Sequence, residues 1–360
     1  MSVQFIGMIG HRLSSEIHDP SGPIFDKAYV TRLAQAHEEA GFDRILVGYW
    51  SDQPDGFLVT ALAGQVTSRI GFLLAHRPGF VAPTLAARKL ATLDHLLDGR
   101  LALHVISGGS DGEQRKDGDY LAHDQRYART DEFLEVVRKV WTEAAPFDHD
   151  GTYYQAQAAW SAIKPVQQPH LPIYFGGSSQ AALEVAGRHA DVFALWGESL
   201  AQTAETIAAV REQAARHGRE VQFSVSFRPI VAETEEAAWA KAETILGQAR
   251  ARLERAGPVI AKKPQSVGAQ RLLDTVAKGD RVDERLWTGI AGLVGGGHNS
   301  TALVGTPEQV ADALLAYHEL GVGTFLIRGF DPVSDAEEYG RALIPLTRAK
   351  VAERVGKVVG

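Results

Sequence analysis

One turn rich in glycine and serine has the residue types of an anion site. The segment GGSSQAALEVAG begins at Gly176 and follows the apolar run 171–176. Its two glycines let the backbone approach a ligand closely, and its two serines supply hydroxyl groups and a helix N-cap. The helix that follows would present free N–H groups and the positive end of its dipole. The turn therefore indicates a phosphate site, although a plain helix cap would use the same residues.

Polar residues also follow most of the other short apolar runs. A second glycine-rich turn, SGGSDGEQ, begins at Ser107 and leaves room for a flat ring system. The remaining runs carry polar residues or a tryptophan near or just after their ends, namely His11-Arg12, Ser51-Asp52, His76-Arg77, Trp196-Gly197-Glu198, Arg228 and Arg328. Arginine holds an oxyanion by paired hydrogen bonds, so Arg228 and Arg328 could make a positive pocket. Each of them could equally be half of a structural ion pair.

Several other chemistries lack their residues in this chain. The absence of cysteine excludes a disulfide framework, a thiolate metal site and a thiol nucleophile. The 13 histidines show no HxH or HExxH spacing, so no metal site is expected, and a GxSxG nucleophile turn is missing. A net charge of −7 is a poor match for nucleic acid. No apolar run of membrane-spanning length and no secretory signal occur, which favours a cytoplasmic enzyme without a membrane partner.

Eight apolar runs of strand type alternate with segments of helical period. The runs are 3–10, 44–50, 69–75, 101–107, 171–176, 191–197, 221–231 and 324–330. Short strands that are apolar throughout are typical of parallel sheets buried on both faces. Eight such units predict a (β/α)8 TIM barrel, in which the carboxyl ends of the strands carry the chemistry.

The barrel is expected to occupy residues 1–360 as a single domain with two insertions. The first is about 108–170 and contains one clear helix at 125–143. The second is about 253–300, basic at its start and glycine-rich at its end. A segment this long inside a compact fold is typical of an insertion or a mobile lid that excludes water, and a static surface loop is the alternative.

The chain resembles the bacterial-luciferase-like flavin monooxygenases, and among them the alkanesulfonate monooxygenase group. The resemblance extends over nearly the whole chain and is clearest at 77–113, 123–133, 169–199, 266–273 and 286–311. It implies a TIM barrel with an insertion that binds reduced FMN, delivered by a separate NAD(P)H-dependent flavin reductase. Enzymes of this group use O2 to break a C–S bond, and they release sulfite and an aldehyde.

The resemblance also assigns residues to the cofactor, position by position. Ser178 and Ser179, together with Gly177, would hold the FMN phosphate. Ser107 and Tyr127 would lie along the isoalloxazine ring and the ribityl chain. The phosphate assignment agrees with the anion site indicated by the glycine and serine turn.

On the substrate side, His11 matches the active-site histidine of the family and Trp196 matches a flat apolar wall. Other positions differ from the sulfonate enzymes. Their arginine and histidine on the seventh strand are Ser226 and Arg228 here, and Phe330 replaces a tyrosine. The lid arginine falls at 295–297, which is all glycine, with a histidine next to it, and the cysteine after the second strand is absent. The expected catalytic set is His11, Trp196, Arg228, His298 and Arg328.

These observations predict a two-component monooxygenase that uses FMNH2 and O2 to oxygenate a small organosulfonate or related anion. Its partners would be the flavin reductase and further copies of the chain, as a dimer or tetramer packed through outer helices. Three alternatives stay open: a monooxygenase of the same family with a non-sulfonate substrate, a deazaflavin-dependent hydride-transfer oxidoreductase, and a non-catalytic flavin-binding protein.

Overall fold

Eight parallel strands form the closed ring of a (β/α)8 barrel in this computed structural model, which describes residues 3–256, 264–297 and 299–359. The strands of the ring are β1 (Gln4–Ile9), β2 (Arg44–Val47), β3 (Gly71–His76), β4 (Leu101–Val105), β7 (Ile173–Phe175), β8 (Val192–Trp196), β9 (Gln222–Val231) and β13 (Val322–Ile327). They follow one another in the sheet, and an additional pairing between β8 and β9 closes the ring. The predicted fold class is confirmed.

Helices alternate with these strands, as the helical-period segments predict. They are α1 (Lys27–Glu39), α2 (Gly56–Gln65), α3 (Pro83–Leu96), α5 (His123–Thr142), α6 (Gln180–His189), α7 (Leu200–Ala215), α8 (Glu235–Ala256) and α11 (Pro307–Glu319). The C-terminal run is α12 (Pro332–Glu338), a π-helical turn η1 (Tyr339–Leu343) and α13 (Ile344–Val359). Local sequence starts them: Asp26 caps α1 by accepting from the Tyr29 backbone N–H, and Pro83 opens α3. Within the described ranges, no helix combines the length and apolar character that a membrane crossing requires.

The chain divides into two compact units. Unit 1 consists of Met1–Ile45, Ala194–Ala209 and Gln222–Gly360, and unit 2 consists of Leu46–Phe193 and Val210–Val221. Strands β2 and β8 begin in one unit and end in the other.

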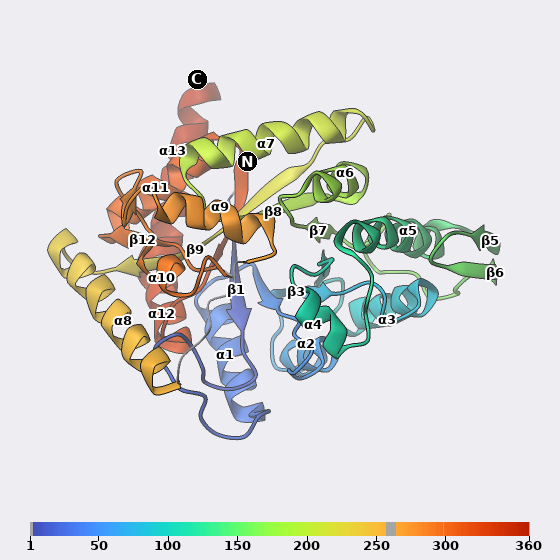
Figure 1. Cartoon of the computed structure of the whole chain (residues 1–360), viewed down its shortest axis with the longest axis horizontal. Coiled ribbons are helices and arrows are strands. Elements are labelled where there is room, and N and C mark those ends of the chain that lie inside the picture. The colour runs from blue at the N-terminus through green and yellow to red at the C-terminus, as the bar shows by residue number, and fades with distance from the viewer. Residues whose placement is uncertain (1–2, 257–263, 298, 360) are drawn as a thin grey trace. The chain divides into compact units, whose positions relative to one another are not determined.

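In unit 2, the first insertion holds more structure than the single helix expected there. Helix α4 (Asp111–Lys116) precedes α5, and a hairpin of β5 (Phe147–Asp150) and β6 (Gln155–Ala159) follows it. The hairpin lies beyond the C-terminal end of α5 in Figure 1. The Glu132 carboxylate on α5 accepts hydrogen bonds from the backbone N–H groups of Thr152, Tyr153 and Tyr154. That one side chain fixes the hairpin turn to α5, a contact that sequence periodicity does not reveal.

In unit 1, much of the second insertion is packed structure. It extends past its expected end at about 300 and contains α9 (Val267–Val276), β10 (Arg281–Val282), β11 (Leu286–Trp287), α10 (Gly289–Leu293) and β12 (Ala302–Gly305). Strand β12 pairs in parallel with β9 outside the ring. Trp287, Ile290 and Val304 lie in one buried apolar cluster with residues of α8. Residues 286–297 and 299–305 therefore belong to the folded body of unit 1, and the lid stays a prediction.

Candidate active site

The glycine and serine turn of unit 2 joins β7 to α6 and gathers three of the expected cofactor residues. Ser179 caps α6, its hydroxyl accepting from the Ala182 backbone N–H at 3.3 Å. The Tyr127 hydroxyl from α5 forms a hydrogen bond with the Ser179 side chain. A Cβ at Gly177, where φ is +147°, would lie 2.7 Å from Ala182 Cβ and 2.9 Å from Tyr127 Oη. Only glycine fits at this position. The backbone N–H groups of the turn, its serine hydroxyls and the N-terminus of α6 form an arrangement that can bind an anion, which we call the anion cradle. Ser178 lies in this turn and is half-buried.

Ser107 lies two residues after β4 and faces the same helix, α5, that carries Tyr127. Its hydroxyl is 2.9 Å from the Thr130 hydroxyl, and the side chain is buried. The next residue, Gly108, has φ +88°, and a Cβ there would overlap the amide of Gln114. Gln114 is completely buried on α4, and its amide nitrogen and oxygen have no hydrogen-bond partner within the described ranges. Sequence reasoning missed Gln114, whose only signal was its place in the second glycine-rich turn.

A charged cluster in unit 2 fixes α4 to the ends of β2 and β3. Arg77 follows β3, is buried, and lies 3.6 Å from both the Glu113 and the Asp117 carboxylates. Its guanidinium stacks over the Tyr49 ring at 4.5 Å, and the Tyr49 hydroxyl donates to Asp117. The Ser51 backbone N–H donates to Glu113 at 2.8 Å. The polar residues after these strands therefore act here as anchors for the loop around Ser107.

In unit 1, Arg228 lies within β9 rather than at its end, which corrects the position expected from sequence. The ring part of β9 ends at Phe227, opposite Ile327, and from Arg228 onward β9 pairs with β12 instead. The Arg228 side chain is fully buried, and its Nη2 donates to the Gly329 carbonyl at 2.7 Å. The guanidinium lies 3.6 Å from the centre of the Phe330 ring. The unpredicted β12 is the reason that Arg228 lies inside a strand.

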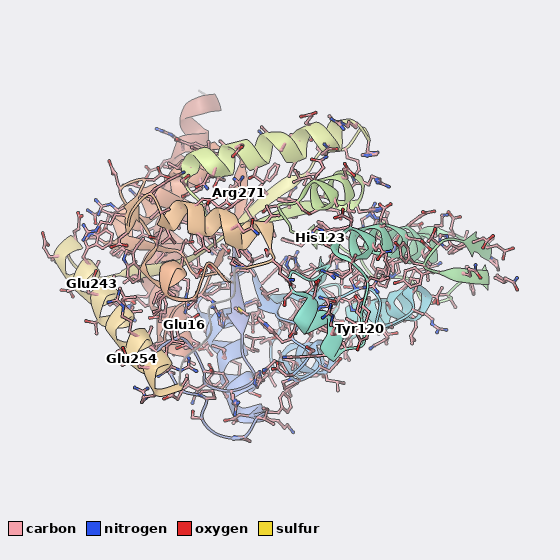
Figure 2. The ribbon with its side chains drawn as sticks, in the orientation of Figure 1. Glu16, Tyr120, His123, Glu243, Glu254 and Arg271 are labelled. Carbon is pink, nitrogen blue, oxygen red and sulfur yellow. The ribbon has the colours of Figure 1, made fainter. Side chains whose placement is uncertain are left out.

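Arg228 and Arg328 share one carboxylate, that of Glu16. Arg228 Nη1 is 2.5 Å from Glu16 Oε2, and Arg328 Nη2 donates to Glu16 Oε1 at 3.0 Å. Burial of Glu16 opposes its ionisation, but the two guanidiniums outweigh this and lower its pKa to about 2. Burial and the like charge of Arg228 lower the pKa of Arg328 to about 10, so it remains charged at neutral pH. Glu16 lies in the loop after β1 (Figure 2), and nothing in the sequence pattern marked it.

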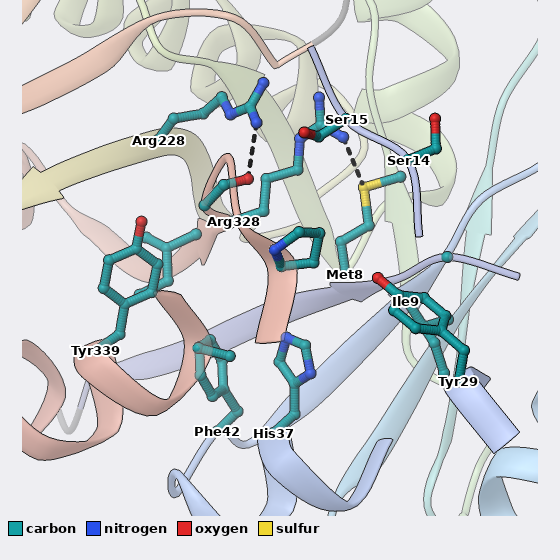
Figure 3. A pocket seen from close by; sticks show the side chains of 15 residues that line it. Met8, Ile9, Ser14, Ser15, Tyr29, His37, Phe42, Arg228, Arg328 and Tyr339 are labelled. Carbon is teal, nitrogen blue, oxygen red and sulfur yellow. Dashed lines mark hydrogen bonds between the residues drawn. The ribbon is translucent and has the colours of Figure 1, made fainter. Parts of the chain in front are cut away.

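These two arginines line a cavity of about 70 Å³ in unit 1 (Figure 3). Met8, Ser14, Ser15 and Tyr29 belong to the same lining. His37 lies on the wall as well, and burial lowers its pKa to about 4, which leaves it neutral. Burial raises the pKa of Tyr29 to about 12. Of the titratable residues that line the cavity, the two arginines are therefore the charged ones at neutral pH, and they share the Glu16 carboxylate, an arrangement that suits a small anion.

The remaining expected residues lie at other strand ends of unit 1. His11 is two residues beyond the end of β1, half-buried, and its carbonyl accepts from the Asp26 backbone N–H at 2.9 Å. Trp196 is the last residue of β8 and is half-buried. The Gly197 carbonyl next to it accepts from the Thr301 hydroxyl at 2.7 Å. His298 lies outside the described residues.

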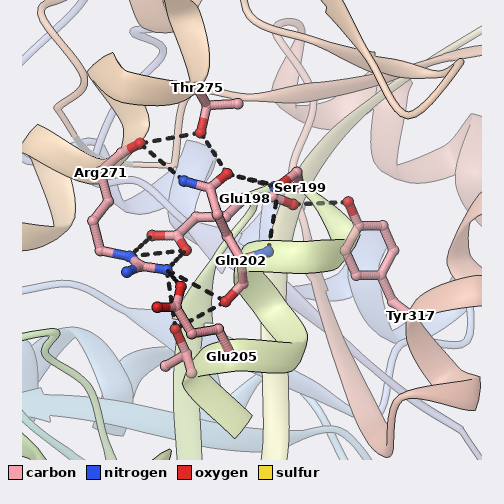
Figure 4. A network of polar contacts seen from close by, with 8 residues as sticks. Glu198, Ser199, Gln202, Glu205, Arg271, Thr275 and Tyr317 are labelled. Carbon is pink, nitrogen blue, oxygen red and sulfur yellow. Dashed lines mark hydrogen bonds and ion pairs between the residues drawn. The ribbon is translucent and has the colours of Figure 1, made fainter. Parts of the chain in front are cut away.

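A polar network missed by sequence reasoning links the second insertion to the end of β8 (Figure 4). Arg271 on α9 donates to both carboxylate oxygens of Glu198, at 2.9 Å from Nε and 2.8 Å from Nη2. Hydrogen bonding to Glu198 raises the pKa of Arg271. The Tyr317 hydroxyl donates to the Glu198 carbonyl at 2.8 Å. Glu198 is two residues past Trp196, so this network holds the loop that follows Trp196 against α9.

Comparison with known proteins gives one family and a set of solved structures. The family model for luciferase-like monooxygenases matches residues 3–324. A structure of riboflavin lyase with modified FMN and its substrate riboflavin is 21% identical, with 97% of this chain and 92% of that chain covered and a TM-score of 0.79. EDTA monooxygenase from Chelativorans sp. BNC1 is 19% identical, with coverages of 97% and 94% and a TM-score of 0.77. A long-chain alkane monooxygenase is 19% identical, with coverages of 97% and 92% and a TM-score of 0.76. At these identities the likeness shows a shared fold.

Proposed function

Because this chain belongs to the luciferase-like monooxygenase family, we propose that it is a two-component, FMNH2-dependent monooxygenase. Reduced FMN comes from a separate NAD(P)H-dependent flavin reductase. The substrate is a small organosulfonate or a related organic anion. The observation that carries the proposal is the anion cradle formed by Tyr127, Gly177 and Ser179 at the start of α6.

The residues of unit 2 fit FMN. The cradle offers backbone N–H groups, two serine hydroxyls and a helix N-terminus to the phosphate, and Gly177 lets the turn pack closely against Tyr127 and the first turn of α6. The buried Gln114 amide beside Gly108 has both a donor and an acceptor to offer, as the pyrimidine edge of a flavin requires. Bound reduced FMN would supply the electrons that activate O2.

On the substrate side, Arg328 binds the anionic group, and Arg228 sets the charge around it through their shared Glu16. His11 donates a hydrogen bond to the substrate or the flavin, and Trp196 supplies an apolar wall. His298 completes the set expected from sequence. The roles of His11, Trp196 and His298 come from the family resemblance, whereas that of Arg328 comes from the cavity it lines.

For a sulfonate, the reaction balances without a metal. The C–S bond breaks, the carbon takes one oxygen atom from O2 to become an aldehyde, and the other oxygen atom leaves as water. The two electrons that the reaction needs would come from reduced FMN, and sulfite and a proton are released. The chain's own task is to orient the C–S bond and keep water out of the site.

The test is a coupled assay with the full chain, a flavin reductase, NADPH, FMN and a panel of sulfonates, read by sulfite release. We expect sulfite only when reductase, O2 and substrate are all present. Arg328→Met should raise the apparent KM for substrate at least tenfold while leaving FMN affinity unchanged. Sulfite release from no member of the panel would exclude sulfonate cleavage.

One observation favours a second candidate, a sulfur-free anion such as a carboxylate. Arg228 is committed to Glu16 and to the Gly329 carbonyl, so the positive charge that remains available is that of Arg328. A single guanidinium serves a carboxylate as well as a sulfonate. Substrate-dependent O2 consumption without sulfite release, in the same assay, would identify this candidate.

We also propose a domain organisation, a cellular location and an assembly for the enzyme. The whole chain 1–360 forms one luciferase-like domain, works in the cytoplasm, and assembles as a dimer or tetramer. Light scattering coupled to size-exclusion chromatography measures the assembly directly, and a monomer at working concentration would contradict that part.

A further inference from the structure

The cavity of unit 1 contains an unequal pair of arginines. Arg228 is fully buried, and its contacts are the Glu16 carboxylate, the Gly329 carbonyl and the Phe330 ring. The Arg328 side chain is 26% exposed, and its Nη1 has only the Met8 thioether at 3.7 Å, a weak acceptor. Among the residues that the structure describes, the Nε atoms of both arginines have no hydrogen-bond partner. Because the Arg228 side chain is fully buried and that of Arg328 is not, Arg328 is the arginine whose donors a ligand can reach (Figure 3).

The cluster of Arg228, Arg328 and Glu16 carries one net positive charge. Two guanidiniums and one carboxylate give +1. His37 and Tyr29 add nothing at neutral pH, because burial lowers the pKa of His37 to about 4 and raises that of Tyr29 to about 12. Glu16 is closer to Arg228, at 2.5 Å, than to Arg328, at 3.0 Å. The surplus positive charge therefore lies on Arg328.

We infer that Glu16 is a specificity-determining residue, which makes the cavity beside Arg328 a subsite for a small, singly charged anionic head group. The inference rests on the proposed function in one respect only, namely that the head group belongs to an organic substrate. Glu16 neutralises one arginine permanently, so one negative charge on the ligand completes the balance. A second negative charge would remain uncompensated, and it would lie close to the Glu16 carboxylate, where few solvent molecules screen the repulsion.

The cavity volume agrees with this assignment. About 70 Å³ admits a carboxylate or sulfonate group but not a large organic body. The Ser14 and Ser15 side chains belong to the lining and can add hydroxyl donors, whereas Met8 provides an apolar surface for the attached carbon. The rest of the substrate must therefore extend out of the cavity.

The test uses two tetrahedral probes that differ in charge, methanesulfonate with one negative charge and sulfate with two. Binding to the flavin-free full chain is measured by calorimetry at constant ionic strength. For the unmodified chain we expect methanesulfonate to bind at least tenfold more tightly than sulfate. Glu16→Gln should strengthen sulfate binding at least tenfold and so remove or reverse the preference. Arg328→Met should abolish binding of both probes.

Two controls separate charge selection from damage to the fold. Glu243→Gln changes an exposed glutamate on α8 (Figure 2) and should leave the ratio unchanged. Glu16→Asp keeps the charge and should keep the preference for one charge. If Glu16→Gln is unstable, sulfate should raise its melting temperature more than methanesulfonate does, because the dianion replaces the lost carboxylate.

An unchanged ratio in Glu16→Gln, or equal binding of both probes to the unmodified chain, would overturn the inference. Neither result depends on flavin or O2. A chain that selects the single charge but never oxygenates a substrate would contradict the proposed function and leave this inference standing.

Discussion

Gly177 is the residue at which the cofactor side of the site can be tested without touching a hydroxyl or a charge. Its φ is +147°, and a Cβ would come within 3 Å of both Ala182 and Tyr127. We predict that Gly177→Ala weakens FMN binding at least tenfold, about 1.4 kcal/mol, because Tyr127 and the start of α6 must move apart. Flavin fluorescence titration measures this.

Gly218→Ala is the matched control for backbone strain. Gly218 also has a positive φ, +62°, but within the described part of the chain nothing lies within 4 Å of a Cβ built there. The Gly218→Ala variant should lower the free energy of unfolding by about 1 kcal/mol and leave FMN affinity unchanged. Equal losses of FMN affinity in the two variants would show that Gly177 has no special part in the cradle.

The residue-scale surprises are side chains whose partners are far away in the sequence. The turn at 176–179 could be identified because its glycines and serines are adjacent and a helix follows. Glu16 could not be identified, because it is one acidic residue in an irregular loop, and its partners are on β9 and just after β13. Glu16 contacts both arginines only after the barrel has brought these strands together.

At the scale of elements, α9 is held to the loop after β8 by one buried ion pair. Glu198 is 4% exposed, and both of its oxygens accept from Arg271. We predict that Arg271→Leu lowers the free energy of unfolding by about 3 kcal/mol, because the Glu198 carboxylate then stays buried without its partner. Urea denaturation followed by circular dichroism measures the loss.

Arg216→Leu gives the matched control. Arg216 pairs with Glu212 one helical turn away on α7, and both side chains are more than half exposed. An exposed pair of this kind contributes about 0.5 kcal/mol or less. The double variant Glu198→Gln with Arg271→Leu should recover part of the stability. A loss at Arg271 no larger than at Arg216 would show that the ion pair does not hold α9.

Strand β12 shows why the second insertion could not be predicted in full. Its four residues, Ala302–Gly305, follow a glycine-rich stretch and are too few to establish a period. Its place is decided by β9, which is ten residues long and continues past the ring to offer a free edge from Arg228 onward. Strand length in a neighbour, rather than local sequence, creates the element.

At the scale of the whole molecule, stability should fall steeply in mild acid. Burial lowers the pKa of His37 in unit 1, and of His76 and His104 in unit 2, from 6.5 to about 4. A lowered pKa means that the unfolded chain binds these protons first, so stability is full above pH 6.5 and is lost as pH falls toward 4. Three such groups give a slope of roughly 4 kcal/mol per pH unit near pH 5.

Denaturant unfolding at a series of pH values measures this slope. His76→Phe should reduce the slope by about a third. His217→Gln changes an exposed histidine and should leave the slope unchanged. A free energy of unfolding that does not change between pH 7 and pH 5 would contradict the assignment of all three histidines as buried and neutral.

The eight-stranded ring was the part of the molecule most open to prediction. All six residues of β3 are buried, and a strand covered on both faces shows as an unbroken apolar run. Eight such runs, each followed by a helix, leave few arrangements other than a barrel. The charge balance around Arg228 and Arg328 could not be predicted from the sequence, because it depends on which charged groups the fold brings into contact.

The central claim is that the chain transfers one oxygen atom from O2 to an organic anion with electrons from reduced FMN. The most direct measurement is mass spectrometry of the product formed under heavy-oxygen-labelled O2 with the reductase-coupled system. We predict one labelled oxygen atom in each aldehyde or oxygenated product, and the second in water. A product without label, or equal turnover in the absence of O2 with a deazaflavin as hydride acceptor, would contradict it.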